Sequence, residues 1–288
     1  MTNSQWMKGG KTLIPGLVLA MALQGAALAQ DKSVPAKPAP AKPALSKTAV
    51  KADAAAVLNK AARQPMLVER ITKSYTLVSQ KVLETRSKRQ MDDAVVEFER
   101  ALKELQTSAP TPEIKENYEL LEQLWGEYRE LTKQAANAER NKLLAEQNEE
   151  VVWISQKGAN LLVDHGKSAR SDLLAAAGDV RVLTQRIAKL YLFRAGGIRS
   201  QVIEEDLKNA EKQYRADMEK LLKAPQNSLQ IASELQLAET QYLFLKQAIE
   251  RLNQNRASKV ELENVAKSCD NILEVMERVA KLYEGMKT

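Results

Sequence analysis

Cysteine and histidine, which supply thiol nucleophiles and many transition-metal ligands, are scarce, since the 288-residue chain has one of each. Cys269 has no second cysteine for an internal disulfide, and we interpret it as a small buried hydrophobe, with a reactive thiol as the alternative. His165 precedes Gly166 at the expected end of a helix, where a cation suits the helix dipole. The sequence shows no cluster of metal ligands, nucleophile elbow, phosphate loop or dinucleotide fingerprint. We therefore expect neither an enzyme nor a bound metal or cofactor.

Acidic and aromatic residues are numerous enough to need a structural explanation. The acidic residues are scattered at the spacing of helix surfaces, which predicts that most of them form a solvated face. The aromatic residues at helical spacing are expected to pack in a core or in a seam between helices. They are Trp125, Tyr128, Trp153, Tyr242 and Phe244.

An internal repeat organises the chain. When residues 57–76 are shifted by 116 positions they fall on residues 173–192, and identical residues coincide more often than unrelated sequences would allow. The agreement continues downstream, where Phe98 falls on Tyr214 and Leu105 on Leu221. We interpret the two stretches as copies of one duplicated unit. The coinciding pairs are Ala61/Ala177, Leu67/Leu183, Arg70/Arg186, Ile71/Ile187, Lys73/Lys189 and Tyr75/Tyr191.

The repeated units are predicted to be helical throughout. Good helix formers dominate after residue 52, glycine and proline are scarce there, and no stretch alternates apolar and polar residues as a half-buried strand would. Four helices with short connections in each copy predict an all-α protein of two tandem antiparallel four-helix bundles, at residues 53–166 and 167–288. The expected helices lie at about 54–84, 88–105, 112 onward, 138–163, 173–195, 200–223, 229 onward and 259 onward.

The first 52 residues differ from the rest in composition. Residues 1–29 have a basic start, an apolar run and an Ala27-Leu28-Ala29 site, which predicts a signal peptide cleaved near Ala29 rather than an uncleaved anchor. Residues 30–52 are rich in Pro, Ala and Lys and are predicted to form a semi-extended tether. Residues 1–51 carry the whole net charge of +6, which leaves 36 basic and 36 acidic residues in the body. The basic isoelectric point therefore gives no reason to expect a nucleic-acid partner.

The two copies begin with stretches that resemble known sensor domains. Asn59-Lys-Ala-Ala-Arg-Gln-Pro-Met-Leu-Val-Glu-Arg70 and Ala177-Gly-Asp-Val-Arg-Val-Leu-Thr-Gln-Arg186 each match part of an Asn-x-Ala-Gly-x-x-Arg-Met-x-x-x-Arg pattern. This pattern opens the periplasmic domain of NarX-like nitrate sensors, and a close variant opens the PilJ-like domain of type IV pilus chemotaxis transducers. The resemblance implies an up-and-down helical bundle with a sensory role. The motif positions in this chain are Asn59, Arg63, Met66, Arg70, Gly178 and Arg186.

In the NarX-like motif the Arg before the Met position contacts the anion, and Arg181 stands at that place. A planar guanidinium can hold a planar oxyanion with two hydrogen bonds, and Gln185 lies one turn further on the same face. The resemblance thus implies a small-anion site at Arg181 and Gln185, near the start of its helix. The alternative is a surface Arg181 paired with an acid such as Asp179. In either case Arg181→Ala is expected to be tolerated by the fold.

Each copy departs from the motif at some positions. Pro65 stands where the first copy should carry the anion-contacting Arg, and Ala62 replaces the Gly. A proline within a helix removes a hydrogen bond, so a bend near Ala61 is expected. The second copy has Ala175 and Val182 in place of the motif's Asn and Met, so the resemblance does not specify nitrate.

The resemblance leaves two arrangements open, since the two copies could pack as a pseudo-dimer or two chains could form a homodimer. No second membrane segment or signalling domain follows the last helix, so we expect a free periplasmic protein that reports through a membrane receptor or a pilus-linked signalling protein. The first hypothesis is a sensory module for a small ligand, such as an oxyanion. The second is a structural or adaptor protein of the cell envelope that binds no ligand.

Overall fold

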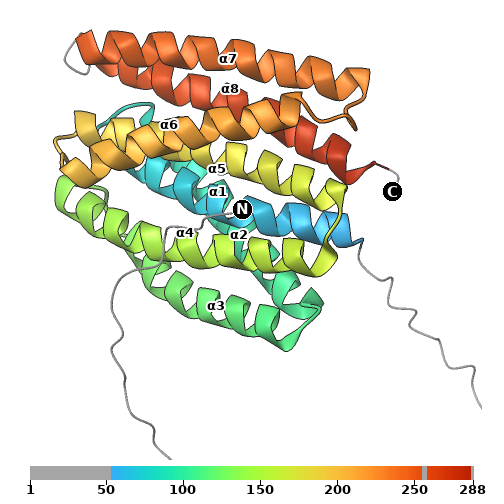
Figure 1. Ribbon diagram of the computed structural model, residues 1–288. Coiled ribbons are helices and arrows are strands. Elements are labelled where there is room, and N and C mark those ends of the chain that lie inside the picture. Colours follow the sequence, from blue (N-terminus) through green and yellow to red (C-terminus); the bar gives the residue numbers. More distant parts are fainter. Residues whose placement is uncertain (1–52, 255–257, 287–288) are drawn as a thin grey trace, which may run out of the picture. The chain divides into compact units, whose positions relative to one another are not determined.

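The computed structural model describes residues 53–254 and 258–286, and in these ranges it contains eight α-helices and no β-strand (Figure 1). The predicted all-α class is therefore confirmed. The leader predicted for residues 1–29 and the tether predicted for residues 30–52 lie outside the described residues. None of the described helices is long and apolar enough to cross a membrane.

The helices begin and end close to the predicted ranges. The first four are α1 (Ala54–Ser79), α2 (Glu84–Ser108), α3 (Pro112–Thr132) and α4 (Ala138–Gly166). The next four are α5 (Ala169–Ala195), α6 (Gln201–Leu222), α7 (Leu229–Gln254) and α8 (Lys259–Glu284). The largest difference is the end of α1, which stops at Ser79 instead of near Glu84. It stops there because Lys81 and Leu83 have φ angles of 54° and 46°, which a right-handed helix cannot continue.

Side-chain caps account for several of these boundaries. Thr111 caps α3 by accepting a hydrogen bond from the Ile114 amide at 3.3 Å, and Ser258 caps α8 by accepting one from Glu261 at 3.4 Å, as the sequence predicts. The cap of α5 lies earlier than predicted, at Ser168, whose hydroxyl accepts from the Ser171 amide at 3.1 Å. The earlier start places Arg181 three turns inside α5, beyond the reach of the helix dipole.

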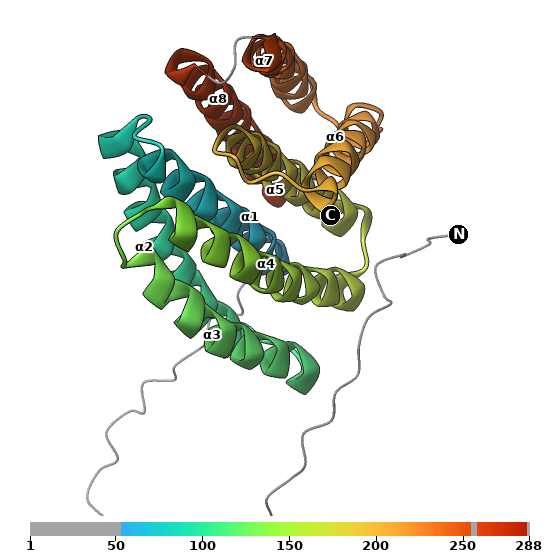
Figure 2. The same cartoon turned by 90° about the vertical axis from the view of Figure 1, so that its left-hand side faces the viewer.

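The same contact scheme occurs twice. In the first four helices α1 packs against α2 and α4, α4 packs against α3, and α2 touches α3 only sparsely. In the last four α5 packs against α6 and α8, α8 packs against α7, and α6 touches α7 only sparsely. Figure 2 shows these two sets with α1 and α5 on their adjoining sides. The domain boundary predicted at residues 166 and 167 falls between α4 and α5 and stays a prediction.

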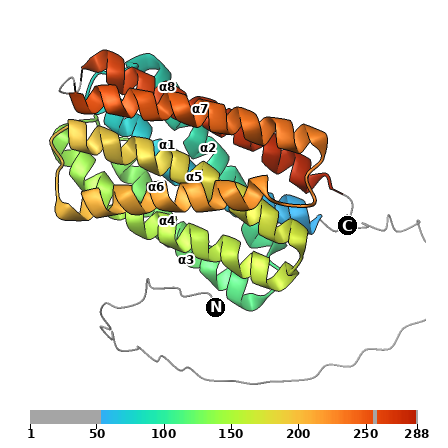
Figure 3. The same cartoon turned by 45° about the horizontal axis from the view of Figure 1, so that its top comes forward.

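The pair α1–α5 forms the most extensive contact between any two described helices (Figure 3). In α1, 17 of 26 residues are buried, and in α5, 18 of 27 are buried, whereas α6 buries only 6 of its 22 residues. The sequence predicts one buried face for residues 173–195. The structure buries α5 on nearly all sides, because α5 contacts helices of its own set and also α1. We call this contact of α1 with α5, together with the flanking α4 and α8, the seam.

The aromatic residues follow the prediction only in part. Trp125, Tyr128 and Tyr242 are buried, but Trp153 is 58 % exposed and Phe244 is 50 % exposed. The core assignment of these last two residues is therefore wrong, because their helices turn those positions away from the other described helices. Trp153 instead makes a cation–π contact with Lys157, whose ammonium lies over the ring at 5.8 Å from its centre.

Cys269 is a fully buried residue of α8, as predicted. Burial is the main cause that raises the pKa of its thiol to about 12, because the thiolate would lose its hydration. A thiol held in this state is protonated at neutral pH and closed to solvent, so the structural interpretation holds and the reactive one does not.

Candidate functional site

The backbones of α1 and α5 approach each other closely at Gly178. A Cβ atom placed on Gly178 of α5 would lie 2.7 Å from the Cβ of Ala62 of α1, so only a glycine allows this approach. Ala62 and Gly178 are equivalent positions in the two copies, 116 residues apart. Contact between equivalent positions is what a two-fold axis produces in a symmetric dimer. The packing of α1 against α5 therefore agrees with the pseudo-dimer that the predicted repeat leaves open, and the duplication itself stays a prediction.

Arg181 lies in this seam and is completely buried, in contrast to the predicted exposed position. Its Nη1 donates to Oε2 of Glu277 on α8 at 3.2 Å, and its Nη2 donates to Oδ1 of Asn59 on α1 at 2.9 Å. Burial lowers the pKa of the guanidinium, and the charge of Glu277 opposes this effect. The partner of Arg181 is therefore Glu277 rather than Asp179, and the guanidinium is closed to solvent.

Two further motif residues bind the same group of side chains. Arg63 of α1 makes an ion pair with Glu277 and another with Glu97 of α2, where Nε lies 2.5 Å from the carboxylate. Asn59 donates from Nδ2 to Glu284 of α8 at 2.6 Å, in addition to accepting from Arg181. Arg63 and Asn59 thus connect the first set of helices with α5 and α8 of the second set.

The remaining predicted site residues lie in the core or close to other charged residues of the seam. Gln185 is buried one turn from Arg181, but its amide donates to the backbone carbonyl of Cys269 at 3.5 Å. Met66 is completely buried in the core. Arg70 is partly buried and its charge helps to lower the pKa of Asp270. The structure therefore brings Asn59, Arg63 and Arg181 together and places Gln185 apart from them in its contacts.

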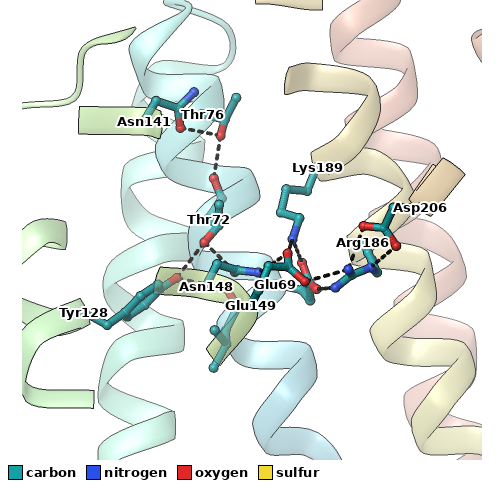
Figure 4. A network of polar contacts seen from close by, with 11 residues as sticks. Glu69, Thr72, Thr76, Tyr128, Asn141, Asn148, Glu149, Arg186, Lys189 and Asp206 are labelled. Atoms are coloured by element: carbon teal, nitrogen blue, oxygen red, sulfur yellow. Dashed lines mark hydrogen bonds and ion pairs between the residues drawn. The ribbon is translucent and has the colours of Figure 1, made fainter. Parts of the chain in front are cut away.

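A second group of charges joins Arg186 and Lys189, which the motif and the predicted repeat identify, to acids that the sequence does not single out. Figure 4 shows Glu69 of α1 between Arg186 and Lys189 of α5. One oxygen of Glu69 lies 2.8 Å from Arg186 and the other lies 2.8 Å from Lys189, and neither Glu69 nor Lys189 is exposed. Glu149 of α4 and Asp206 of α6 complete the group, each 2.6 Å from Arg186.

The charges in this group hold one another ionised. Burial opposes the charge of Glu149, but Lys189 and Arg186 outweigh it and lower the pKa of this carboxyl to about 2. Burial likewise opposes the charge of Arg186, whereas Glu69, Glu149 and Asp206 raise its pKa above the usual value. A buried charge group of this kind fixes one geometry of α1 against α5, because every shift would separate charges without water to replace them.

A related buried ion pair joins α1 to α8. Lys73, the equivalent of Lys189, is buried in α1 and its ammonium lies 2.6 Å from Asp270 of α8. Gln90 and Arg86 of α2 also bind Asp270, at 2.8 and 3.1 Å. Lys73 of α1 thus pairs with Asp270 of α8. In the corresponding way, Lys189 of α5 pairs with Glu149 of α4. The expectation of a solvated acidic face fails for Glu69 and Asp270.

A signal for these residues exists in the sequence. Lys73 and Lys189 coincide when the two copies are aligned, and so do Arg70 and Arg186, although they stand on helices that are otherwise rich in apolar residues. A charge kept at the same place in both copies of a buried helix indicates a paired charge inside the fold. Their acidic partners lie on other helices and could not be assigned without the structure.

Asp179 occupies a different environment, beside a second carboxyl. It accepts a hydrogen bond from Gln156 of α4 at 3.0 Å, and Asp217 of α6 lies close enough to disfavour its charge. Burial, followed by the charge of Asp217, raises the pKa of Asp179 from 3.8 to about 7. Between about pH 4 and about pH 7, the carboxyl of Asp179 therefore keeps its proton in the folded protein and has lost it in the unfolded chain.

We expect Asp179→Asn to change how stability depends on pH. Because the folded-state pKa is raised, the wild type should lose stability relative to the variant as pH rises from about 4 to about 7, with a total on the order of 1–3 kcal/mol. Denaturant unfolding of both proteins at about pH 5 and about pH 8 measures the difference. Asp172→Asn, at an exposed carboxyl of the same helix, is the control. Equal differences at both pH values would show that Asp179 ionises normally in the folded protein.

The described residues also set limits on the chemistry. No group of three or more His, Cys, Asp and Glu in residues 53–254 and 258–286 has a metal-binding arrangement. The buried acids and bases of the seam are paired with one another instead of facing an open cleft. The geometry is that of a helical pair whose relative position is set by charge contacts.

The comparison with family models agrees with this geometry. Residues 48–150 match the model described as type IV pili methyl-accepting chemotaxis transducer N-term, PilJ. The matched segment spans α1, α2, α3 and the first half of α4, and it contains the motif positions of the first copy. No curated protein and no solved structure gives a significant match to the chain. Residues 48–150 of this chain are therefore similar to the N-terminal domain of type IV pilus chemotaxis transducers, as the motif at residues 59–70 predicts.

Proposed function

We propose that this chain is a non-catalytic sensory protein of the periplasm that carries two PilJ-like bundles as an intramolecular counterpart of a receptor dimer. It reports the state of its seam to a membrane receptor or to a pilus-linked signalling protein. The family match of residues 48–150 supports the sensory role, and the leader pattern at residues 1–29 supports the location. Recovery of the protein from the periplasm with a new N-terminus near Gln30 would check the location.

The observation that carries this proposal is the packing of α1 against α5. Equivalent positions meet at Ala62 and Gly178, and paired charges cross the seam in both directions. A packed interface with discrete charge pairs has few alternative arrangements, so a small displacement at one end moves the whole helix pair. A partner that contacts both bundles can therefore detect such a change.

The ligand is a separate part of the proposal. An oxyanion at Arg181 would have to take the place of the Glu277 carboxylate, since Arg181 already donates to Glu277 and Asn59. This filled environment favours the second candidate, an envelope adaptor that binds no anion at Arg181. The variant Glu277→Gln distinguishes the anion sensor from the adaptor. If an anion competes with Glu277 for Arg181, nitrate should raise the melting temperature of the variant more than that of the wild type. No effect of nitrate on either protein supports the adaptor.

The role in signalling is tested in the organism of origin. An in-frame deletion should change pilus-dependent surface motility or its directional response, and the wild-type chain supplied in trans should restore it. Cross-linking of the supplied protein should recover a membrane receptor or a component of the pilus signalling system. Unchanged motility in the deletion strain, although the wild-type strain produces the protein, would overturn the proposal.

A further inference from the structure

A groove runs between the start of α1 and the end of α2, away from the buried charges of the seam. It consists of two hollows of about 380 and 530 Å³. Both hollows are lined by Lys60 of α1 and by Arg100 and Glu104 of α2, so they are neighbouring parts of one groove. Each part has the volume of a site for a small metabolite.

A single ion pair, Lys60 with Glu104, lines both hollows. Lys60 and Glu104 reach across the groove to each other, and their side chains are 38 % and 47 % exposed. Exposed ion pairs contribute little to stability, so a ligand that offers Lys60 another acceptor can open this one at low cost. An incoming molecule can thus use both parts of the groove.

The polar residues of the groove have a surplus of positive charge. Lys60, Arg63, Arg100 and Lys103 stand against Glu97, Glu104 and Glu284. The basic side chains of Lys60 and Arg63 are paired with acids. Arg100 and Lys103 form no ion pair or side-chain hydrogen bond with another described residue, although Arg100, after Lys60, helps to lower the pKa of the exposed Glu104. Two cations on successive turns of α2 are therefore free to bind an acidic group.

Apolar side chains accompany these charges. Leu67 and Ala101 line the first hollow and are buried, and Val57 lines the second. Apolar surface beside a few convergent polar groups is the usual composition of a small-molecule site. It favours an organic anion, because a bare inorganic ion could not use the apolar surface.

The second copy of the repeat lacks these cations. At the equivalent positions, 116 residues later, it has Ala176 for Lys60, Asp179 for Arg63, Ala216 for Arg100 and Glu219 for Lys103. The paired bundles share their helix arrangement, so the fold alone does not demand basic residues here. The basic groove is a property of the first copy.

The groove is directly connected to the seam. Arg63 lines the groove and binds Glu277, and Asn59 lines it and binds both Arg181 and Glu284. A carboxylate that draws Arg63 into the groove weakens the contact between Arg63 and Glu277. Occupancy of the groove therefore changes how α1 is held against α5 and α8.

We propose that this groove binds a small organic carboxylate, with Arg100 and Lys103 as its main contacts and Arg63 as the residue that passes occupancy to the seam. The proposal rests on the sensory function proposed above and supplies its ligand class and site. It places the ligand outside the buried surroundings of Arg181.

Isothermal titration calorimetry on the purified full chain tests the site, with succinate and citrate as probes and putrescine as a probe of opposite charge. Wild type should bind at least one carboxylate and not putrescine. Arg100→Ala and Lys103→Ala should each raise its Kd about tenfold, the worth of one charge-assisted contact. Arg89→Ala, which removes an exposed arginine of α2 three turns earlier, should leave the Kd unchanged. Glu277→Gln should lower the Kd, because Arg63 is then less strongly held by the seam.

The outcomes separate this proposal from the sensory function. Absence of carboxylate binding to wild type, or equal Kd values for wild type and Arg100→Ala, overturns the groove site even if the deletion strain has a motility defect. Binding that depends on Arg100, together with normal motility in the deletion strain, supports the groove site and overturns the sensory role.

Discussion

Arg181→Ala should lower the free energy of unfolding by about 4 kcal/mol, the order expected when one partner of a buried ion pair is removed and a cavity remains. Arg181 is completely buried, and its loss leaves Asn59 without a donor and Glu277 with Arg63 as its only cation. Arg181→Lys should recover part of the loss, since an ammonium keeps the charge but cannot reach both acceptors with a planar fork. Chemical denaturation followed by circular dichroism measures these differences.

The control for this prediction lies next to Glu277 in α8. Arg278 pairs with Glu234, but its side chain is 49 % exposed, so Arg278→Ala should cost less than about 1 kcal/mol. A loss of similar size for both variants would show that Arg181 is not anchored as the structure places it. This expected loss differs from the tolerance of Arg181→Ala predicted from the sequence, because that prediction assumed an exposed side chain and Arg181 is buried.

Glu69→Ala should be nearly as damaging, with a loss of about 3 kcal/mol, because two cations then share the remaining acids in a buried place. Arg186 and Lys189 each lose a carboxylate oxygen at 2.8 Å, and Lys189 is not exposed. Glu149 still neutralises part of the positive charge of Lys189, since its carboxylate lies 2.9 Å from the Lys189 ammonium. The free energy of unfolding from denaturant titration is again the measurement.

A double variant distinguishes charge from packing. If the loss comes from an unpaired charge, Lys189→Met combined with Glu69→Ala should be more stable than Glu69→Ala alone. Glu219→Ala is the matched control, since Glu219 is 65 % exposed in a pair with Lys223 within one helix. If the double variant loses as much free energy of unfolding as the two single variants together, the lost side-chain volume, rather than the unpaired charge, causes the destabilisation.

The helices themselves could be predicted because local chemistry specifies them. Gly and Pro are scarce in the body, and capping residues such as Thr111 and Ser258 stand where helices begin. The boundary between α1 and α2 was placed less well, because it depends on positive φ angles at Lys81 and Leu83. Neither residue type favours such angles, so the sequence carries no local sign of the turn.

The environment of the site could not be predicted in the same way. The repeat and the motif identify Arg181 and Arg186 as residues of interest, but the partner Glu277 is 96 positions from Arg181 in the sequence. Whether a polar residue on a helix faces solvent or another helix depends on packing between distant segments. Trp153 and Phe244 show the converse error, since aromatic spacing alone does not say which side of a helix is covered.

The sequence by itself determined the helical class and the family resemblance of the motif at residues 59–70, because these depend on composition and short-range spacing. The duplication of the unit stays a prediction. Only the tertiary structure decided that α1 and α5 pack together at Ala62 and Gly178. The same packing decided that Arg181 is buried against Glu277 and Asn59 instead of being open to an anion. The physical reason is that burial and charge pairing arise between helices, and the pattern within one helix does not specify its neighbour.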